Sequence, residues 1–228
     1  MIELSHISKI FNPGKANAFE ALREIDLTLE MGRMTVFKGP SGSGKTTLLS
    51  IIGCMTRPTS GRITVNDRET TSLPERFAAE IRRETFGFIF QDYHLIRGIS
   101  VLENVMIPVY PTGKKHRIVK EKAHELLSRL NMTLKVYERV ENLSGGEQQR
   151  VAISRALIND PSVIIADEPT AHLDTELSRR FMALMVGFKQ DGKTLLIASH
   201  DPLVSGYEGV DRVVGLRDGK IVEDGVLK

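Results

Sequence analysis

The glycine-rich segment Gly39-Pro-Ser-Gly-Ser-Gly-Lys45-Thr46 constrains the fold of this chain more than any other stretch. A short, apolar, β-prone run at 34–38 precedes it, and an apolar helical run at 47–52 follows it. A strand, a glycine loop and a helix in this order are the setting that a phosphate-binding loop requires. The glycines let successive backbone N–H groups point inward, and the helix N-terminus adds partial positive charge. The segment therefore predicts binding of a nucleoside triphosphate, with Lys45 on the β- and γ-phosphates and the Thr46 hydroxyl on Mg²⁺.

Composition limits the class of protein. A length of 228 residues suffices for one large α/β domain or for a core with an inserted lobe. The 31 basic and 29 acidic residues leave a net charge of only +2, so no basic field argues for nucleic acid as a partner. The single cysteine, Cys54, excludes an internal disulfide and is expected to pack as a small hydrophobe in a reducing compartment. No signal peptide pattern and no apolar run of about 18 residues is present, so we expect another chain to supply any membrane span.

Hydrophobic periodicity divides the chain into regions of different character. Alternation of apolar and polar residues predicts half-buried strands at 2–7, 25–29 and 61–66, which we interpret as a small antiparallel sheet beside the loop. A compact apolar strand at 86–90 follows, and helical patterns dominate from about Asp92 to Asn159. Within that region, apolar residues at helical spacing predict one amphipathic helix: Val119, Ala123, Leu126, Leu127 and Leu130. Its basic residues, Lys114 to Lys120, are interpreted as a solvated face.

Polar side chains follow two continuous apolar runs of strand length. Ser162–Asp167 ends in the pair Asp167-Glu168, and Leu195–Ser199 ends at His200. Apolar runs of this kind predict parallel strands that are buried on both faces. Ligands of α/β sheets bind at the carboxyl ends of such strands, so these residues are candidates for the site chemistry. An Asp218-Gly219 pair between two further apolar runs predicts a hairpin.

A second helix start, at Leu143-Ser-Gly-Gly-Glu147, has its own signature. Ser144 and Glu147 have the spacing of a capping box ahead of an apolar-periodic run. Two glycines in the first turn leave backbone N–H groups uncovered, which favours an anion at this point. From the residues alone, the segment is either a second anion site or simply a well-capped helix.

Taken together, these segments resemble the ATP-binding subunits of ABC transporters, and the resemblance covers nearly the whole chain. The elements that match in order and approximate spacing are Gly39–Thr46, Gln91, Leu143–Glu147, Asp167-Glu168, Ala171–Asp174 and His200. The stretch 42–54 and Arg57–Gly61 are further similar to the branch that contains lipoprotein-release, macrolide-export and cell-division ATPases. The resemblance implies an α/β fold, with a P-loop NTPase (RecA-like) core, a small antiparallel β subdomain and an inserted α-helical subdomain. Residues 1–91 and 160–228 would form the core with its β subdomain, and 92–159 the helical subdomain that carries the signature.

The resemblance also implies a role for each matching residue. Catalysis is assigned to Glu168, which would polarise the attacking water, together with His200, Gln91 and Lys45. Mg²⁺ is assigned to Thr46, Gln91 and Asp167. Nucleotide contacts are assigned to Phe11 under the adenine and to the loop residues Gly39, Pro40, Ser41, Gly42, Ser43, Gly44, Lys45, Thr46 and Thr47. Ser144, Gly145, Gly146 and Glu147 would bind the γ-phosphate of ATP held by a second copy of the chain.

The function implied is Mg²⁺-ATP hydrolysis that powers an integral membrane permease-like partner, with no nucleic acid involved. The chain would then be cytoplasmic and peripheral on the membrane through that partner. Alternatives are an ATP-dependent scaffold of a membrane complex, a soluble ABC ATPase of DNA repair or translation, and a small-molecule P-loop kinase. The kinase leaves Leu143–Glu147 and Glu168 without a role, and the soluble ATPases usually carry coiled-coil insertions that this chain lacks.

Three residues depart from the family pattern, and one apolar cluster is a candidate docking surface. Phe11 replaces the commoner tyrosine, Lys38 places a charge at the end of a central strand, and His172 stands where the branch commonly has a small residue. We expect the membrane partner to dock just past Gln91, on the apolar cluster Tyr93, His94, Leu95, Ile96 and Leu102. The alternative is that this cluster forms a small core of the helical lobe.

Overall fold

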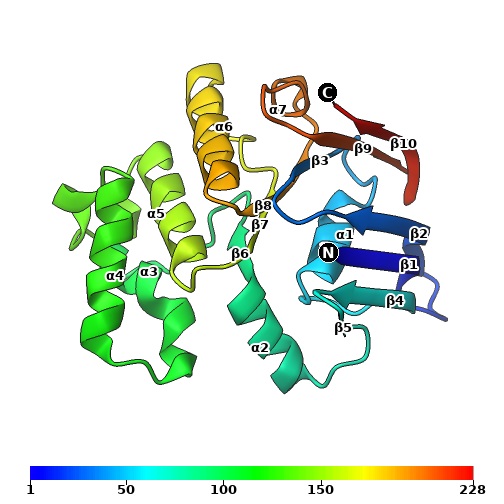
Figure 1. Ribbon diagram of the computed structural model, residues 1–228, viewed down its shortest axis with the longest axis horizontal. Helices are drawn as coiled ribbons and strands as arrows, with labels where there is room; N and C mark the ends of the chain where they lie inside the picture. Colours follow the sequence, from blue (N-terminus) through cyan, green and yellow to red (C-terminus); the bar gives the residue numbers. More distant parts are fainter. Residues whose placement is uncertain (228) are drawn as a thin grey trace.

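A six-stranded sheet in the order β10-β9-β3-β8-β7-β6 organises the computed structural model, which describes residues 1–227 (Figure 1). Its strands are β3 (Met34–Lys38), β6 (Phe86–Ile89), β7 (Val163–Asp167), β8 (Thr194–Ser199), β9 (Arg212–Arg217) and β10 (Lys220–Val226). Neighbours from β9 through β6 pair in parallel, and β10 pairs antiparallel with β9 across the predicted Asp-Gly hairpin. Every residue of β8 is buried, as the continuous apolar runs predicted for strands covered on both faces.

A second, four-stranded sheet in the order β2-β1-β4-β5 confirms the predicted antiparallel unit. It consists of β1 (Ile2–Phe11), β2 (Phe19–Leu29), β4 (Ser60–Val65) and β5 (Arg68–Glu69). β1 and β2 run further than the alternation indicated, and the register between them shifts near His6, which has a positive φ of 50°. The shift lets the strand bend, so β1 continues to Phe11 with side chains on altered faces.

The helices lie on both sides of the six-stranded sheet, and several of them form a lobe at one end (Figure 1). The α-helices are α1 (Lys45–Ile52), α2 (Glu75–Thr85), α3 (Val101–Met106), α4 (His116–Arg129), α5 (Gly145–Leu157), α6 (Thr175–Gln190) and α7 (Pro202–Ser205). The short 3-10 helices are η1 (Ile107–Thr112), η2 (Thr133–Lys135) and η3 (Val140–Asn142). The predicted amphipathic helix is α4, which buries Val119, Ala123 and Leu127 in the lobe.

Three apolar clusters hold these layers together. One fills the space between the two sheets and α1, a second packs α5 and α6 against the other face of the central sheet, and a third lies inside the helical lobe. Helix α5 contributes to two of them, because Ile153 packs in the cluster on the sheet whereas Val151 packs in the cluster of the lobe. Cys54 packs partly buried against the first cluster, and burial raises the pKa of its thiol. Among residues 1–227, no helix combines the length and apolarity needed to cross a bilayer.

The charge at the end of β3 has a partner that the sequence did not indicate. Lys38 Nζ lies 2.9 Å from Glu223 Oε2 on β10. Strand β9, which separates β3 from β10, carries Gly215 opposite Lys38, and Gly215 has no side chain to block the ion pair. The lysine is therefore satisfied at the surface of the sheet instead of being buried as an isolated charge.

Candidate nucleotide site

The loop between β3 and α1 has the backbone geometry of an anion cradle. Gly39, Gly42 and Gly44 have φ values of 154°, 78° and 105°, all in the range that favours glycine. A Cβ on Gly44 would lie 2.6 Å from the Ala21 carbonyl oxygen, so only glycine fits there. No side chain caps the start of α1, and the buried Ser43 hydroxyl has no hydrogen-bonding partner among the described residues. Donors without an acceptor at a helix N-terminus fit the phosphates of a nucleotide.

Lys45 lies folded across this loop. Its ammonium group donates to the carbonyl oxygens of Gly39, at 2.8 Å, and Pro40, at 3.1 Å. It also lies 3.4 Å from Glu168 Oε1, with only 5% of its side chain exposed. The loop thus holds a buried positive charge that faces the Glu168 carboxylate.

Thr46 and Asp167 form an oxygen-rich corner next to the loop. The Thr46 hydroxyl donates to Asp167 Oδ1 over 3.0 Å. Burial raises the pKa of Asp167, an effect that the Thr46 hydrogen bond opposes and that nearby Glu168 adds to. A pocket of about 310 Å³ is lined by Thr46, Asp167 and Gln91 among others, so the structure brings the three predicted metal residues to one cavity. Hydroxyl, carboxylate and amide oxygens are hard donors of the kind that Mg²⁺ prefers, and the residues present therefore fit this ion.

Glu168 and His200 are in direct contact, which the sequence did not reveal. His200 Nδ1 lies 2.9 Å from Glu168 Oε2, and the His200 backbone N–H donates to the same oxygen over 3.3 Å. Glu168 has a φ of 46°, in the left-handed region that is costly for residues other than glycine. This turn of the backbone directly after β7 aims the carboxylate toward both His200 and Lys45.

Parallel pairing explains why these side chains meet. Lys38 on β3 is aligned with Ser199 on β8, and Asp167 on β7 is aligned with Ala198 on β8. The loops that carry Lys45, Glu168 and His200 therefore leave the sheet at one edge. Residues far apart in the sequence are placed together by strand register alone.

The signature segment forms a separate structure at the start of α5. The Ser144 hydroxyl accepts from the Glu147 backbone N–H, and the Glu147 carboxylate accepts from the Ser144 backbone N–H over 2.8 Å, which confirms the predicted capping box. The pKa of Glu147 is lowered mainly by the backbone N–H of Ser144 and then by the Ser144 hydroxyl, both of which donate to the Glu147 carboxylate. Within residues 1–227, no hydrogen bond or ion pair joins Leu143–Glu147 to the loop Gly39–Thr46.

Phe11 is exposed, whereas part of the predicted docking cluster is buried. Phe11 is 40% exposed at the end of β1, with Lys9 Nζ 5.0 Å from its ring centroid, and its role under adenine stays a prediction. The docking cluster was predicted as an exposed patch, which is wrong for Tyr93 and Leu102, because both are buried. Leu102 belongs to the apolar core of the lobe, whereas Ile96 is half-exposed.

A glycine loop between the parallel strand β3 and a helix, with an Asp-Glu pair at the end of β7 in the same sheet, defines the P-loop class of nucleoside triphosphatases. The ABC transporter family model matches residues 22–171, and the chain belongs to this family. It is therefore an ATP-binding cassette of the ABC transporter ATPase family, as the sequence resemblance implied.

Curated relatives match over nearly the whole chain. A macrolide export ATP-binding/permease protein of Hahella chejuensis is 42% identical over 99% of this chain, which spans only 34% of that relative's length. An uncharacterized ABC transporter ATP-binding protein of Bacillus subtilis is 41% identical over 98% of this chain and 96% of its own length. The chain thus corresponds to about a third of the macrolide-export relative and to nearly all of the second relative.

Solved structures confirm the fold class. The dimeric structure of MJ0796, a bacterial ABC transporter cassette, has a TM-score of 0.91 and 34% sequence identity, covering 100% of this chain and 99% of that one. A structure of the same cassette in a post-hydrolysis state is bound to ADP and Pi, with the same TM-score of 0.91. The α/β P-loop core with an antiparallel β subdomain and an inserted helical subdomain is therefore the fold of this chain.

Proposed function

We propose that the chain hydrolyses Mg²⁺-ATP and that hydrolysis powers a separate integral membrane partner, in export, lipoprotein release or mechanotransmission. The observation that carries this proposal is the Glu168 carboxylate, which His200 holds 3.4 Å from the Lys45 ammonium of the phosphate-binding loop. A carboxylate that is fixed beside a phosphate site is suited to orient a water molecule for attack. A binding module that only retains ATP has no need of this arrangement.

The residues divide the work of phosphoryl transfer between them. The N–H groups at the start of α1 and the Lys45 ammonium bind the phosphates and stabilise the charge that develops on the transferring group. Glu168 would orient the attacking water, and His200 holds the Glu168 carboxylate in place. In this proposal His200 also contacts the γ-phosphate. Thr46, Gln91 and, through water, Asp167 would hold Mg²⁺, which supplies further neutralisation of the phosphate charge.

A second copy of the chain completes the site in this proposal. The signature segment is not bonded to the loop of its own chain, and its two glycines lie at a helix start that favours anions. The solved cassette with 34% identity is described as dimeric. Two chains would then enclose two ATP molecules, with Ser144–Glu147 of each chain against the γ-phosphate bound by the other.

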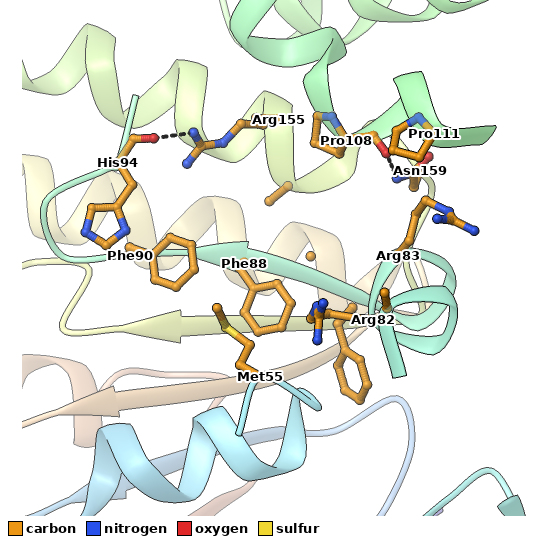
Figure 2. Close-up of a pocket in the computed structure, with 14 residues that line it drawn as sticks. Met55, Arg82, Arg83, Phe88, Phe90, His94, Pro108, Pro111, Arg155 and Asn159 are labelled. Carbon is orange, nitrogen blue, oxygen red and sulfur yellow. Dashed lines mark hydrogen bonds between the residues drawn. The ribbon is translucent and has the colours of Figure 1, made fainter. Parts of the chain in front are cut away.

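In this proposal, the membrane partner would dock into an apolar groove of the chain. A cavity of about 440 Å³ lies between α2, β6 and the helical lobe, with Met55, Phe88 and Phe90 along one wall and Pro108 on the other (Figure 2). Apolar grooves of this size on an otherwise polar surface mark binding sites for other proteins. The relatives described as ATP-binding/permease proteins support a permease as the partner. The chain would then be peripheral on the cytoplasmic face of the membrane.

Contacts of α5 connect this groove to the nucleotide-facing end of the lobe. The Arg155 guanidinium donates to the carbonyl oxygens of Tyr93 and His94, and the dashed line in Figure 2 marks the bond to His94. At the other end of the same helix, Gln149 Nε2 donates to the Pro169 carbonyl oxygen over 2.8 Å, just after Glu168. Movement of a docked partner would thus be transmitted through α5 toward the signature and the catalytic edge.

Replacing Glu168 with glutamine tests the proposal. The substitution keeps the size and hydrogen bonding but removes the charge, so turnover should fall by roughly 10²–10⁴-fold. ATP affinity should persist because Lys45, Thr46 and the loop N–H groups remain. With ATP bound and not cleaved, light scattering should show a dimer with Mg²⁺-ATP and a monomer without nucleotide.

Glu125→Gln, at an exposed position on α4, is the matched control and should change neither turnover nor assembly. Hydrolysis by Glu168→Gln within about tenfold of the unaltered chain would show that Glu168 is not the base. The scaffold alternative is separated by a steady-state ATPase assay with and without a co-expressed membrane partner, because a scaffold would show little turnover in either case.

A further inference from the structure

The connection from η1 into α4 concentrates positive charge on a chain that is nearly neutral overall. We call residues 110–118 the basic tip. Lys114, Lys115, His116 and Arg117 are consecutive and exposed, and no acidic residue occurs from 107 to 120. Among the described residues, the one ion pair of the tip joins Arg117 to Glu121 over 3.5 Å, with both side chains largely exposed. Lys114 and Lys115 form no ion pair among the described residues, so the tip keeps a local excess of positive charge.

The stability of α4 does not explain this charge. Helix α4 begins at His116, has no side-chain cap and carries no acidic residue in its first turn. Cations at a helix N-terminus oppose the macrodipole and destabilise the helix by a few tenths of a kcal/mol each. The capped starts of α3 and α5, which each place a glutamate in the first turn, show the arrangement that helix stability favours.

Apolar side chains flank the charges of the tip. Tyr110 is 55% exposed and Ile118 is 54% exposed, on either side of the cationic run. An aromatic ring with a polar end, an aliphatic side chain and a cluster of lysine and arginine are the combination that binds at the surface of an anionic bilayer. A nucleic-acid site would instead need a basic groove or stripe, and the net charge of +2 supplies no wider field of that kind.

The position of the tip agrees with a membrane. Pro108 and Pro111 of η1 line the groove described above, and the tip continues directly from them. In Figure 1 the connection from α3 to α4 lies at the lower edge of the lobe, on the same side of the molecule as α2. A partner embedded in the bilayer and docked in that groove would bring this edge toward the membrane surface.

We infer that the basic tip binds the anionic headgroups of the membrane in which the partner lies, next to the docked partner. The orientation in this inference rests on the proposed function, whereas the lipid contact itself requires neither hydrolysis nor nucleotide. Each lysine or arginine near such a surface strengthens binding by roughly fivefold at low salt, so three of them make a measurable difference.

Sedimentation of the full chain with lipid vesicles tests the inference without nucleotide. The chain should bind vesicles of mixed phosphatidylglycerol and phosphatidylcholine, should not bind phosphatidylcholine alone, and should be released by high salt because screening weakens exposed charges. The triple variant Lys114→Glu, Lys115→Glu and Arg117→Glu should bind at least about tenfold more weakly. A second variant, Tyr110→Ser with Ile118→Ser, should also lose binding while keeping its net charge.

The matched control reverses the same number of exposed charges elsewhere, at Arg62, Arg68 and Arg179, none of which forms an ion pair among the described residues. Equal loss of vesicle binding in this control would overturn the inference, as would failure of the unaltered chain to bind anionic vesicles at low salt. Binding of duplex DNA or RNA by the tip as strong as its vesicle binding would overturn it in favour of nucleic acid. Circular dichroism checks that every variant is folded.

Failure of this inference and failure of the proposed function give different results. The proposed function fails if Glu168→Gln keeps its turnover in a lipid-free assay. The lipid inference fails in the vesicle assay, whatever the turnover is. The tip variants should retain the basal ATPase rate, because none of their residues lies at the nucleotide site.

Discussion

Helix α1 begins directly after Gly44 and helix α5 begins at Gly145, and both are expected to face a phosphate, yet their N-terminal ends are capped in opposite ways. The turn before α1 ends on Gly44 in a left-handed conformation, without a side-chain cap and with the Ser43 hydroxyl unpartnered among the described residues. The turn before α5 ends on Ser144 in an extended conformation, and Glu147 closes a complete capping box. The start of α1 is therefore left for a ligand, whereas the start of α5 is already satisfied by its own side chains.

The difference indicates when each site binds. A helix N-terminus without a side-chain cap is stabilised most by a bound anion. The loop before α1 should therefore bind nucleotide in the isolated chain. At α5 the Glu147 carboxylate already interacts with the helix dipole, which leaves the glycine N–H groups as the remaining donors. Binding at α5 is then weak by itself and becomes effective only when a second chain presents a phosphate that is already bound.

Lys45→Ala should have the largest effect of the substitutions considered, because it removes a charge from the phosphate site at the start of α1. Losing a charged hydrogen bond to phosphate should weaken ATP binding by about 10- to 100-fold and abolish turnover. Calorimetric titration with Mg²⁺-ATP measures the affinity. Lys220→Ala, an exposed residue on β10, is the control and should leave affinity unchanged. Affinity of Lys45→Ala within about threefold of the unaltered chain would contradict the assignment.

Asp167→Asn, at the nucleotide site, should affect Mg²⁺ binding and folding stability in opposite directions. If Asp167 holds Mg²⁺ through water, apparent Mg²⁺ affinity in the ATPase assay should fall by roughly 10- to 100-fold. Because burial raises the pKa of Asp167, its ionised form destabilises the nucleotide-free chain at neutral pH, and this cost disappears as the pH falls below the ordinary range of the group. Asparagine should therefore raise the thermal midpoint at neutral pH and leave it nearly unchanged in acid. A midpoint that falls at neutral pH would argue against this account.

Ser144→Ala tests the site at the start of α5, and it should have the smallest effect of the three substitutions. Loss of the cap should cost about 1 kcal/mol of the free energy of unfolding. Nucleotide binding by the monomer should persist, and the ATP-dependent dimer should be lost in the Glu168→Gln background. Helix α3 offers the control, because Ser100 and Glu103 form the same capping box without glycines after the serine. If Ser100→Ala disrupts the dimer equally, the effect is one of stability and the shared site is wrong.

The sequence indicated those parts of the molecule that depend on local order. Loop, helix starts and buried strands were predicted because glycine spacing, capping residues and apolar runs act within a few residues of one another. The capping box at Ser144 and the face of α4 are examples that the structure confirms. The length of β1 was not predicted, since a register shift near His6 interrupts its alternation.

Contacts between segments far apart in the sequence could not be predicted from such local patterns. The Lys38–Glu223 ion pair joins residues 185 positions apart, and it depends on which strand lies between them. The contact of Glu168 with His200 follows from the register of β7 and β8, which no local pattern encodes. The burial of Tyr93 and Leu102 was left open as an alternative, because an apolar cluster in the sequence looks the same whether it forms a core or a surface patch.

The left-handed backbone at Glu168 has a consequence for laboratory evolution of this protein. A residue with a side chain costs about 1–2 kcal/mol in that conformation relative to glycine, which adopts it freely. A library randomised at this codon and screened only for survival of heating would therefore enrich glycine or asparagine. The same library screened for turnover would return glutamate. Selection for thermal stability and selection for turnover would thus favour different residues at this one position.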